Sequence, residues 1–216
     1  MMRSNYDSEL TKMREDIILM SRISTNMFEQ CMRLFFDERA VSIQNLEEMK
    51  KQQEVIEKEI ERTAAKLITL QQPVAKDTRE IICAVLIAAD WMKISSHITD
   101  ISDISVLCTE KIELDSEEWK MLRLIKDAAE KMLNGAAEAY RTRNTDKALF
   151  TAETDDEIDR TLWKMWNNFP ESGGGSSFSF YPLMIAEHIE RIGDHAANIC
   201  EEIMYLEKYE QVRLNN

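Results

Sequence analysis

Residues 57–63 of this 216-residue chain read Glu-Lys-Glu-Ile-Glu-Arg-Thr, and residues 155–161 read Asp-Asp-Glu-Ile-Asp-Arg-Thr. Four of the seven positions are identical, and two more exchange Glu for Asp. At the same offset of 98 residues, residues 93–97 (Lys-Ile-Ser-Ser-His) fall on residues 191–195 (Arg-Ile-Gly-Asp-His). Because both windows share one ungapped register, they indicate an internal duplication.

The spacing of apolar residues predicts that both copies are helical. The chain has only 5 Gly and 3 Pro, too few for the many turns of a β-sandwich or barrel. Apolar residues recur instead about every 3.6 positions, which places them on one face of a helix. We therefore expect an all-α protein of two tandem three-helix bundles, with one unit at residues 1–112 and the other at 113–216. The six expected helices run through residues 17–34, 46–67, 81–104, 116–136, 149–165 and 182–209.

Three local signals mark the ends of these helices. Pro73 is expected in the first turn of the third helix, because the amide that Pro lacks has no partner there. Asn144 is expected to cap the fifth helix, since a short polar side chain accepts the first free amides. The Pro-Glu-Ser-Gly-Gly-Gly-Ser-Ser segment at residues 170–177 is predicted to be a flexible loop.

Charge and composition exclude several classes of function. The net charge is −13 with no basic block, so neither a nucleic acid nor an anionic membrane surface is an expected partner. The longest apolar run, Ile81–Ala89, is about half a membrane span, and we expect no signal peptide at the N-terminus. The four cysteines are scattered without a Cys-x-x-Cys pair. We predict a cytoplasmic protein.

Carboxylates repeat at helical spacing in the second unit. On the last helix, one face carries a row of acceptor side chains, here called the acidic row. It is made up of the carboxylates Glu187, Glu190, Asp194 and Glu201, with the uncharged amide Asn198 among them. Asp155 and Asp159 form another pair four residues apart on the preceding helix. If the two helices face each other, Asp155, Asp159, Glu190 and Asp194 repel strongly unless they share protons or a cation. The sequence predicts a metal site here, with a solvated acidic surface as the alternative.

In the first unit, only half of this pattern recurs. Glu57 and Glu61 repeat the first carboxylate pair, but Met92 and Ser96 occupy the places of Glu190 and Asp194. The neighbouring residues expected to compensate in part are Asp90, His97 and Asp100. This face is either a weaker metal site or a polar remnant of the duplication.

Motifs for covalent or cofactor chemistry are missing from the sequence. It contains no Glu-x-x-His motif of the di-iron carboxylate bundles and no P-loop or Gly-x-Ser-x-Gly motif. We therefore expect a protein that is not an enzyme. A metal store, a metalloenzyme or a helical scaffold with a solubilising acidic face remain open alternatives.

Two stretches resemble the PhoU family of phosphate-uptake regulators. Residues 190–199, Glu-Arg-Ile-Gly-Asp-His-Ala-Ala-Asn-Ile, are similar to its C-terminal signature. Residues 72–79, Gln-Pro-Val-Ala-Lys-Asp-Thr-Arg, resemble its first-unit loop and helix start, and residues 6–10 fit its N-terminus. The resemblance spans essentially the whole chain.

This resemblance implies a function and a set of ligands. Family members are non-catalytic cytoplasmic partners of the phosphate ABC transporter and its phosphate-sensing histidine kinase, reaching the membrane only through these proteins. Their acidic motifs hold metal ions, as iron or zinc clusters, and a homodimer is expected. Carried over by position, the metal ligands are Asp155, Asp159, Glu190 and Asp194, with Glu57 and Glu61 as half of a first-unit site. The chain departs from the family pattern at Met92, Ser96 and Thr99.

Overall fold

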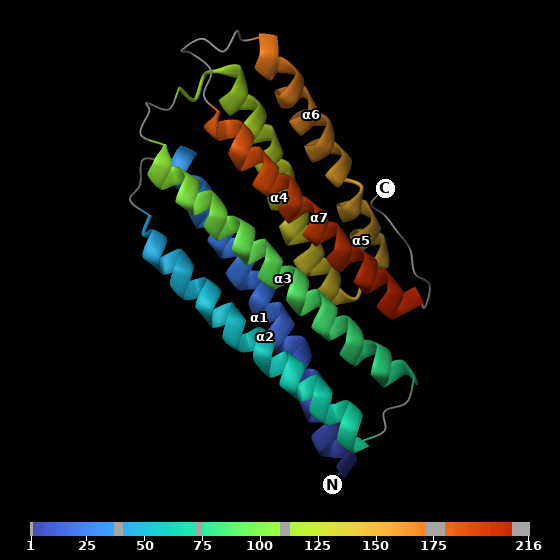
Figure 1. Cartoon of the computed structure of the whole chain (residues 1–216). Helices are drawn as coiled ribbons and strands as arrows, with labels where there is room; N and C mark the ends of the chain where they lie inside the picture. The colour runs from blue at the N-terminus through green and yellow to red at the C-terminus, as the bar shows by residue number, and fades with distance from the viewer. Residues whose placement is uncertain (1, 37–40, 72–74, 109–112, 172–179, 209–216) are drawn as a thin grey trace.

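The computed structural model of the chain describes residues 2–36, 41–71, 75–108, 113–171 and 180–208. Within these ranges every regular element is a helix, and the helices lie roughly side by side in an elongated bundle (Figure 1). They are α1 (Met2–Phe36), α2 (Ile43–Gln71), α3 (Ala75–Leu107), α4 (Glu117–Thr142), α5 (Thr145–Ala152), α6 (Asp155–Glu171) and α7 (Tyr181–Lys208).

Two groups of helices make up the bundle. α1, α2 and α3 pack on one another, and so do α4, α5, α6 and α7, except that α5 and α6 follow each other along the chain. The groups meet where α3 lies against α7 and α1 against α4, so the α3–α7 pair runs through the middle (Figure 1). Both groups contribute to one hydrophobic core, whose largest fully buried members include Trp91 and Trp119. The predicted all-α fold of tandem helical bundles is confirmed.

The expected fifth helix is two helices. Asn144 caps α5 as predicted, its Oδ1 accepting a hydrogen bond from the amide of Lys147 at 2.9 Å. The chain then turns at residues 153–154, and a new helix begins at Asp155. Thr154 and Glu157 have the spacing of a capping box, and acidic residues in a first turn are favoured by the helix dipole. The prediction of one continuous helix was wrong because apolar periodicity alone does not register this start signal.

Other predicted boundaries have mixed outcomes. α7 begins one residue before Pro182 and extends to Lys208, close to the expected range. α6 continues to Glu171, so the expected loop does not begin at Pro170. Pro73 and the remainder of the predicted glycine-rich loop, residues 172–177, lie outside the described residues.

α3 is apolar because it is surrounded by other helices. By length and composition it is the one helix in the described ranges that is long and apolar enough to cross a membrane. However, 56% of its most apolar stretch is buried within the protein. α3 contacts α1, α2 and α7, and a helix covered on several sides carries apolar residues on all of them. Packing within the bundle therefore accounts for its composition.

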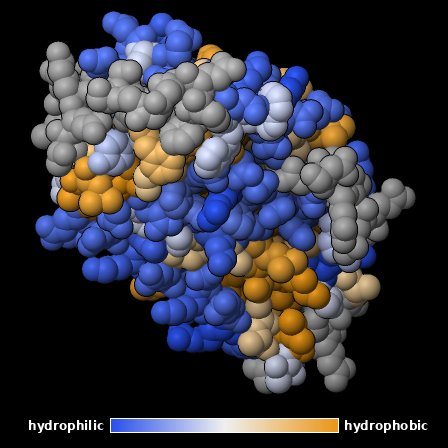
Figure 2. All heavy atoms as spheres, turned by 45° about the horizontal axis from the view of Figure 1, so that its top comes forward, coloured by the Kyte–Doolittle hydropathy of each residue, from blue (hydrophilic) through white to orange (hydrophobic). Residues whose placement is uncertain are grey.

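The surface seen in Figure 2 is largely hydrophilic, with apolar side chains gathered in separate areas. Large exposed apolar residues on α5 and α6 include Phe150, 68% exposed, and Trp163, 69% exposed. Exposed aromatic side chains of this kind are typical of surfaces that contact other proteins when they form a contiguous patch.

Gly135→Ala is expected to lower the free energy of unfolding by about 1–3 kcal/mol, because an added methyl group overpacks the contact between α4 and α5. A Cβ at Gly135 would overlap Oγ1 of Thr151 and lie 2.8 Å from its Cγ2. Urea unfolding followed by circular dichroism measures the change. The double variant Gly135→Ala/Thr151→Ala removes the colliding atoms and should recover most of the loss. A single variant as stable as wild type contradicts the prediction.

Candidate functional site

The first turn of α6 packs directly against α7. Asp155, the first residue of α6, is only 3% exposed. Gly193 of α7 lies against it, because a Cβ built on Gly193 would stand 2.7 Å from Asp155 Oδ1 and 3.1 Å from Ile158 Cδ1. The absence of a side chain at Gly193 therefore permits this close approach. Since Gly193 directly precedes Asp194, the contact brings Asp155 alongside the acidic row of α7.

Asp159, Glu190 and Asp194 are close enough to repel one another. Burial, followed by the charges of Asp194 and Asp159, raises the pKa of Glu190 to about 7. Burial, followed by the charge of Asp194, raises the pKa of Asp159. Arg191 opposes the shift at Glu190 without cancelling it. We call Asp155, Asp159, Glu190 and Asp194 the acidic cluster.

The donor atoms of the acidic cluster fit a bound cation. All are carboxylate oxygens, which are the preferred ligands of hard cations, whereas zinc sites are built mainly from Cys and His. A cation would remove the repulsion that raises the pKa of Glu190. Asp159 is exposed and Glu190 and Asp194 are half-buried, so an ion can reach them from solvent. Any side chain at position 193 would intrude on the seat of Asp155.

The α2 side of the first unit carries the expected acidic pair. Glu57 and Glu61 lie one turn apart on α2, and burial, then Glu61 and Glu54, raise the pKa of Glu57. Positive charge opposes this shift, since Lys58 and Lys93 both lower that pKa. The first-unit pair is therefore already partly neutralised by lysine.

The α3 side of the first unit adds no carboxylate at the two equivalent positions. Met92 packs against the hydrophobic core, and Ser96 Oγ donates to the carbonyl of Met92 at 3.1 Å. A lysine from α2 reaches α3 one turn further on, where Lys50 Nζ donates to Thr99 Oγ1 at 3.3 Å. The first unit thus provides half of the donor set that the second unit provides.

Asp90, His97 and Asp100 face α7 rather than the α2 pair they were expected to support. Asp90 Oδ1 lies 2.9 Å from Nδ1 of His195. His97 Nδ1 lies 3.3 Å from Nδ1 of His188, and Asp100 Oδ2 lies 3.7 Å from each of these two nitrogens. For Asp90 and His97 the physical reason is rotation about the helix, because both lie about 140–160° around α3 from Met92. Asp100 lies only about 80° from Met92, and its contact with the two imidazoles follows from its place one turn after His97.

All 3 histidines of the chain therefore meet at the α3–α7 contact. The rings of His97 and His195 stack with centroids 5.7 Å apart. Burial, then the proximity of His188 and His195, lowers the pKa of His97 to about 4, and burial lowers the pKa of His188. His188 was not among the residues predicted from the sequence, although the 98-residue offset pairs it with Asp90 just as it pairs His195 with His97.

The chain is an all-α protein built as a duplicated helical bundle, with pairs of carboxylates on neighbouring helices. Comparison with known families shows to which family of all-α proteins it belongs. The model of the PhoU domain matches residues 17–105 and again residues 122–203. The chain belongs to the PhoU family, which confirms the resemblance seen in the sequence.

Relatives of similar length support this membership. The chain is 30% identical over 228 aligned positions to the phosphate-specific transport system accessory protein PhoU homolog of Clostridium acetobutylicum, covering 100% of both chains. It is 26% identical to PhoU homolog 1 of Thermotoga maritima, covering 94% of this chain and 89% of the relative.

Two crystal structures share the fold. PhoU from Pseudomonas aeruginosa has a TM-score of 0.86 at 23% identity, covering 95% of this chain and 100% of that one. The phosphate transport system regulatory protein PhoU from Streptococcus pneumoniae has a TM-score of 0.83 at 21% identity, covering 96% and 99%. At these identities the likeness shows that the arrangement of helices is common to all three.

Proposed function

We propose that this chain is a non-catalytic cytoplasmic regulator of phosphate uptake and phosphate-starvation signalling. The observation that carries the proposal is the end-to-end match to a relative named as an accessory protein of the phosphate-specific transport system. In this proposal the chain is an adaptor between the ATPase of the phosphate ABC transporter and the phosphate-sensing histidine kinase. It meets the membrane only through these proteins, and its net charge of −13 disfavours a nucleic-acid partner.

The adaptor role includes a metal ion held by Asp155, Asp159, Glu190 and Asp194. Support comes from burial and, after it, mutual repulsion, which together raise the pKa values of Asp159 and Glu190. The approach of Asp155 to Gly193 adds further support. A bound cation supplies charge neutralisation and a link between α6 and α7. The all-oxygen set suits a hard cation better than it suits zinc, and the family resemblance makes iron the cation that we propose. Glu57 and Glu61 are the residues of the first-unit half site.

Glu190→Ala/Asp194→Ala is expected to remove the metal that the acidic cluster holds in the wild-type protein, since it removes half of the ligands. Elemental analysis of the purified full chain measures the metal content. Glu57→Ala/Glu61→Ala is the matched control, because it removes the repeat-equivalent pair of the half site, and it should retain the metal. Unchanged metal in the first variant contradicts the proposed site, and a loss in the second assigns metal to the first unit as well.

The regulatory role is tested in the cell. Deleting the gene is expected to release phosphate uptake and a phosphate-starvation reporter from repression when phosphate is plentiful, and the wild-type gene should restore both. A deletion strain with unaltered uptake and reporter output contradicts the regulatory role. Metal binding that persists despite that result favours the alternative, a carboxylate-rich metalloprotein that is not tied to phosphate.

The same proposal includes the boundary between the two units and the oligomeric state of the chain. We propose that the first unit ends at residue 112 and the second begins at residue 113, and the match of the family domain to residues 17–105 and 122–203 supports a boundary in this region. The exposed aromatic side chains Phe150 and Trp163 suit a protein contact, and we propose that the chain forms a homodimer. Sedimentation of the full chain measures its mass and decides between monomer and dimer.

A further inference from the structure

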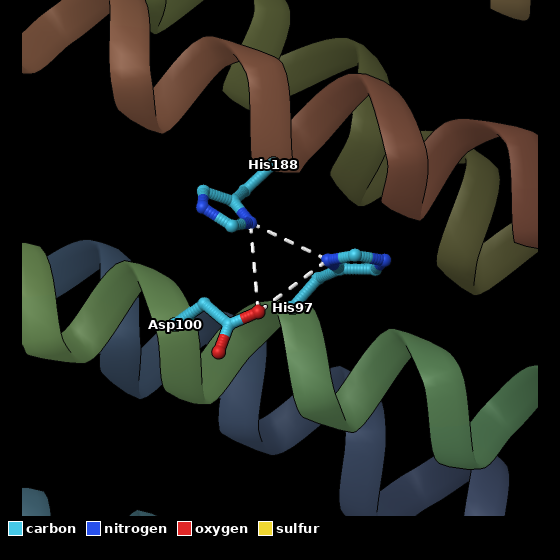
Figure 3. A group of neighbouring side chains, drawn as sticks. All are labelled: His97, Asp100 and His188. Atoms are coloured by element: carbon cyan, nitrogen blue, oxygen red, sulfur yellow. Dashed lines mark hydrogen bonds and ion pairs between the residues drawn. The ribbon is translucent and has the colours of Figure 1, made fainter.

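The α3–α7 contact contains a group of nitrogen and oxygen donors that is separate from the acidic cluster. His97 and Asp100 project from α3 and His188 projects from α7, and the three side chains point toward one another (Figure 3). Their side chains are 16%, 50% and 25% exposed, respectively. We call these three residues the histidine cluster.

The distances within the histidine cluster are close to those around a tetrahedral metal ion. Metal–ligand bonds of about 2.0–2.1 Å at tetrahedral angles separate the ligand atoms by about 3.3–3.4 Å. The two Nδ1 atoms are 3.3 Å apart, and Asp100 Oδ2 lies 3.7 Å from each of them. Small side-chain rotations therefore suffice to form three metal bonds. The half-exposed Asp100 leaves the fourth position open to water.

The repeat provides an internal comparison for this geometry. The 98-residue offset relates Asp90 to His188 and His97 to His195, so the His195–Asp90 pair is the counterpart of the His97–His188 pair. His195 and Asp90 satisfy each other as imidazole and carboxylate at 2.9 Å. The His97–His188 pair instead brings two imidazoles together. Asp100 lies near both imidazoles, at a distance too long for a direct hydrogen bond.

The two equivalent pairs also differ in the third residue that lies at the same repeat position beside each of them. The repeat equivalent of Asp100 is Asn198, which carries no charge. Only one of the two equivalent places thus combines two imidazoles with a carboxylate, a donor set that suits zinc and similar transition metals. Both donor sets lie in the same α3–α7 interface. A property that is common to the whole interface therefore does not explain the difference between them.

We propose that His97, Asp100 and His188 bind a divalent transition-metal ion of the zinc class, which links the two repeats across the α3–α7 contact. Burial favours the neutral imidazoles that bind metal. Arg191 is the nearby opposing charge, and its exposed position lets solvent screen it. This site differs from the acidic cluster in its donors and in the pair of helices that it joins.

Zinc binding to the full chain tests the proposal in the Glu190→Ala/Asp194→Ala background, where the α7 carboxylates of the acidic cluster are absent. Isothermal titration with zinc chloride should detect binding of a single ion. Adding His97→Gln or His188→Gln should weaken this binding by at least about 100-fold, since even the loss of a residue that only supports a ligand costs 10–100-fold. Failure of the regulatory proposal leaves this result unaffected.

His195→Gln in the same background is the matched control. It makes the same chemical change at the repeat-equivalent position of His97 and in the same interface. Because its ring stacks on His97 but is not a proposed ligand, it should weaken zinc binding far less than His97→Gln does. Circular dichroism verifies that each variant folds, and Asp100→Asn, at the most exposed of the three ligands, provides a further variant that disturbs packing least. Zinc affinity that is equal in the His97→Gln, His188→Gln and Asp100→Asn variants and their parent overturns the proposal. An equal loss with His195→Gln also overturns it, because the interface rather than ligation is then responsible.

Discussion

Trp91→Ala is expected to lower the free energy of unfolding by about 3–5 kcal/mol, the range for deleting a large aromatic side chain from a protein core. Trp91 is fully buried on α3, and α3 is the helix that contacts α1, α2 and α7. Truncating Trp91 therefore leaves a cavity beside α3, the helix that joins the two groups of helices. Urea unfolding followed by circular dichroism measures the loss.

Val106→Ala is the control for this experiment. Val106 is 63% exposed on the same helix, α3, and substitutions at such positions usually change the free energy of unfolding by no more than about 0.5 kcal/mol. Trp91→Phe retains most of the buried volume and should lose less stability than Trp91→Ala. Similar losses for Trp91→Ala and Val106→Ala contradict the role assigned to α3.

Metal is expected to reverse the effect of pH on stability. Without metal, Glu190 retains its proton to a pKa of about 7 in the folded chain, against 4.5 for an unperturbed Glu. The folded state therefore binds more protons in this window, and stability falls as the pH rises through it. Because the carboxyl is half-buried and solvent screens its neighbours, we expect a loss of about 1–2 kcal/mol between pH 5 and pH 8.

Bound metal replaces those protons and should restore stability at high pH. At pH 8, free metal at about 1,000 times its Kd for the acidic cluster stabilises the folded chain by about 4 kcal/mol. Glu190→Ala/Asp194→Ala should abolish the part of the gain that comes from the acidic cluster. Unfolding measured in chelator and in metal at each pH tests both parts.

The matched control for the pH effect is Glu190→Gln in chelator. His97 and His188, whose pKa values are lowered, change stability in the opposite direction below about pH 6.5. The informative quantity is therefore the difference in the free energy of unfolding between wild type and Glu190→Gln at each pH. Parallel pH profiles for the two proteins rule out the assigned role of Glu190.

The helical fold was predictable because its cause is local. Apolar spacing depends only on residues three or four apart. It located the long helices along the chain, although α1 begins at Met2, well before the expected range of 17–34. The break between α5 and α6 was missed because periodicity does not register a helix start, although Thr154 and Glu157 carry a local signal for one. The acidic pairs were identified for the same reason, since residues four apart on a helix share a face.

The histidine cluster was not predictable in this way, because it depends on how one repeat packs on the other. Apolar spacing shows that α3 has a buried face, but it does not show whether α2 or α7 covers a given residue. His97 and Asp100 were consequently assigned to the α2 side, while the structure places them against His188 of α7. Only the contact between α3 and α7 brings the three side chains together.

The unequal pairs across the α3–α7 contact have an evolutionary consequence. Two identical subunits related by a symmetry axis must carry the same residue at both equivalent places, so a substitution that creates a second imidazole at one of them creates it at both. Here the equivalent places hold Asp90 and His188. Fusion of the two copies into one polypeptide has thus allowed a single inherited contact to diverge into two chemically different ones.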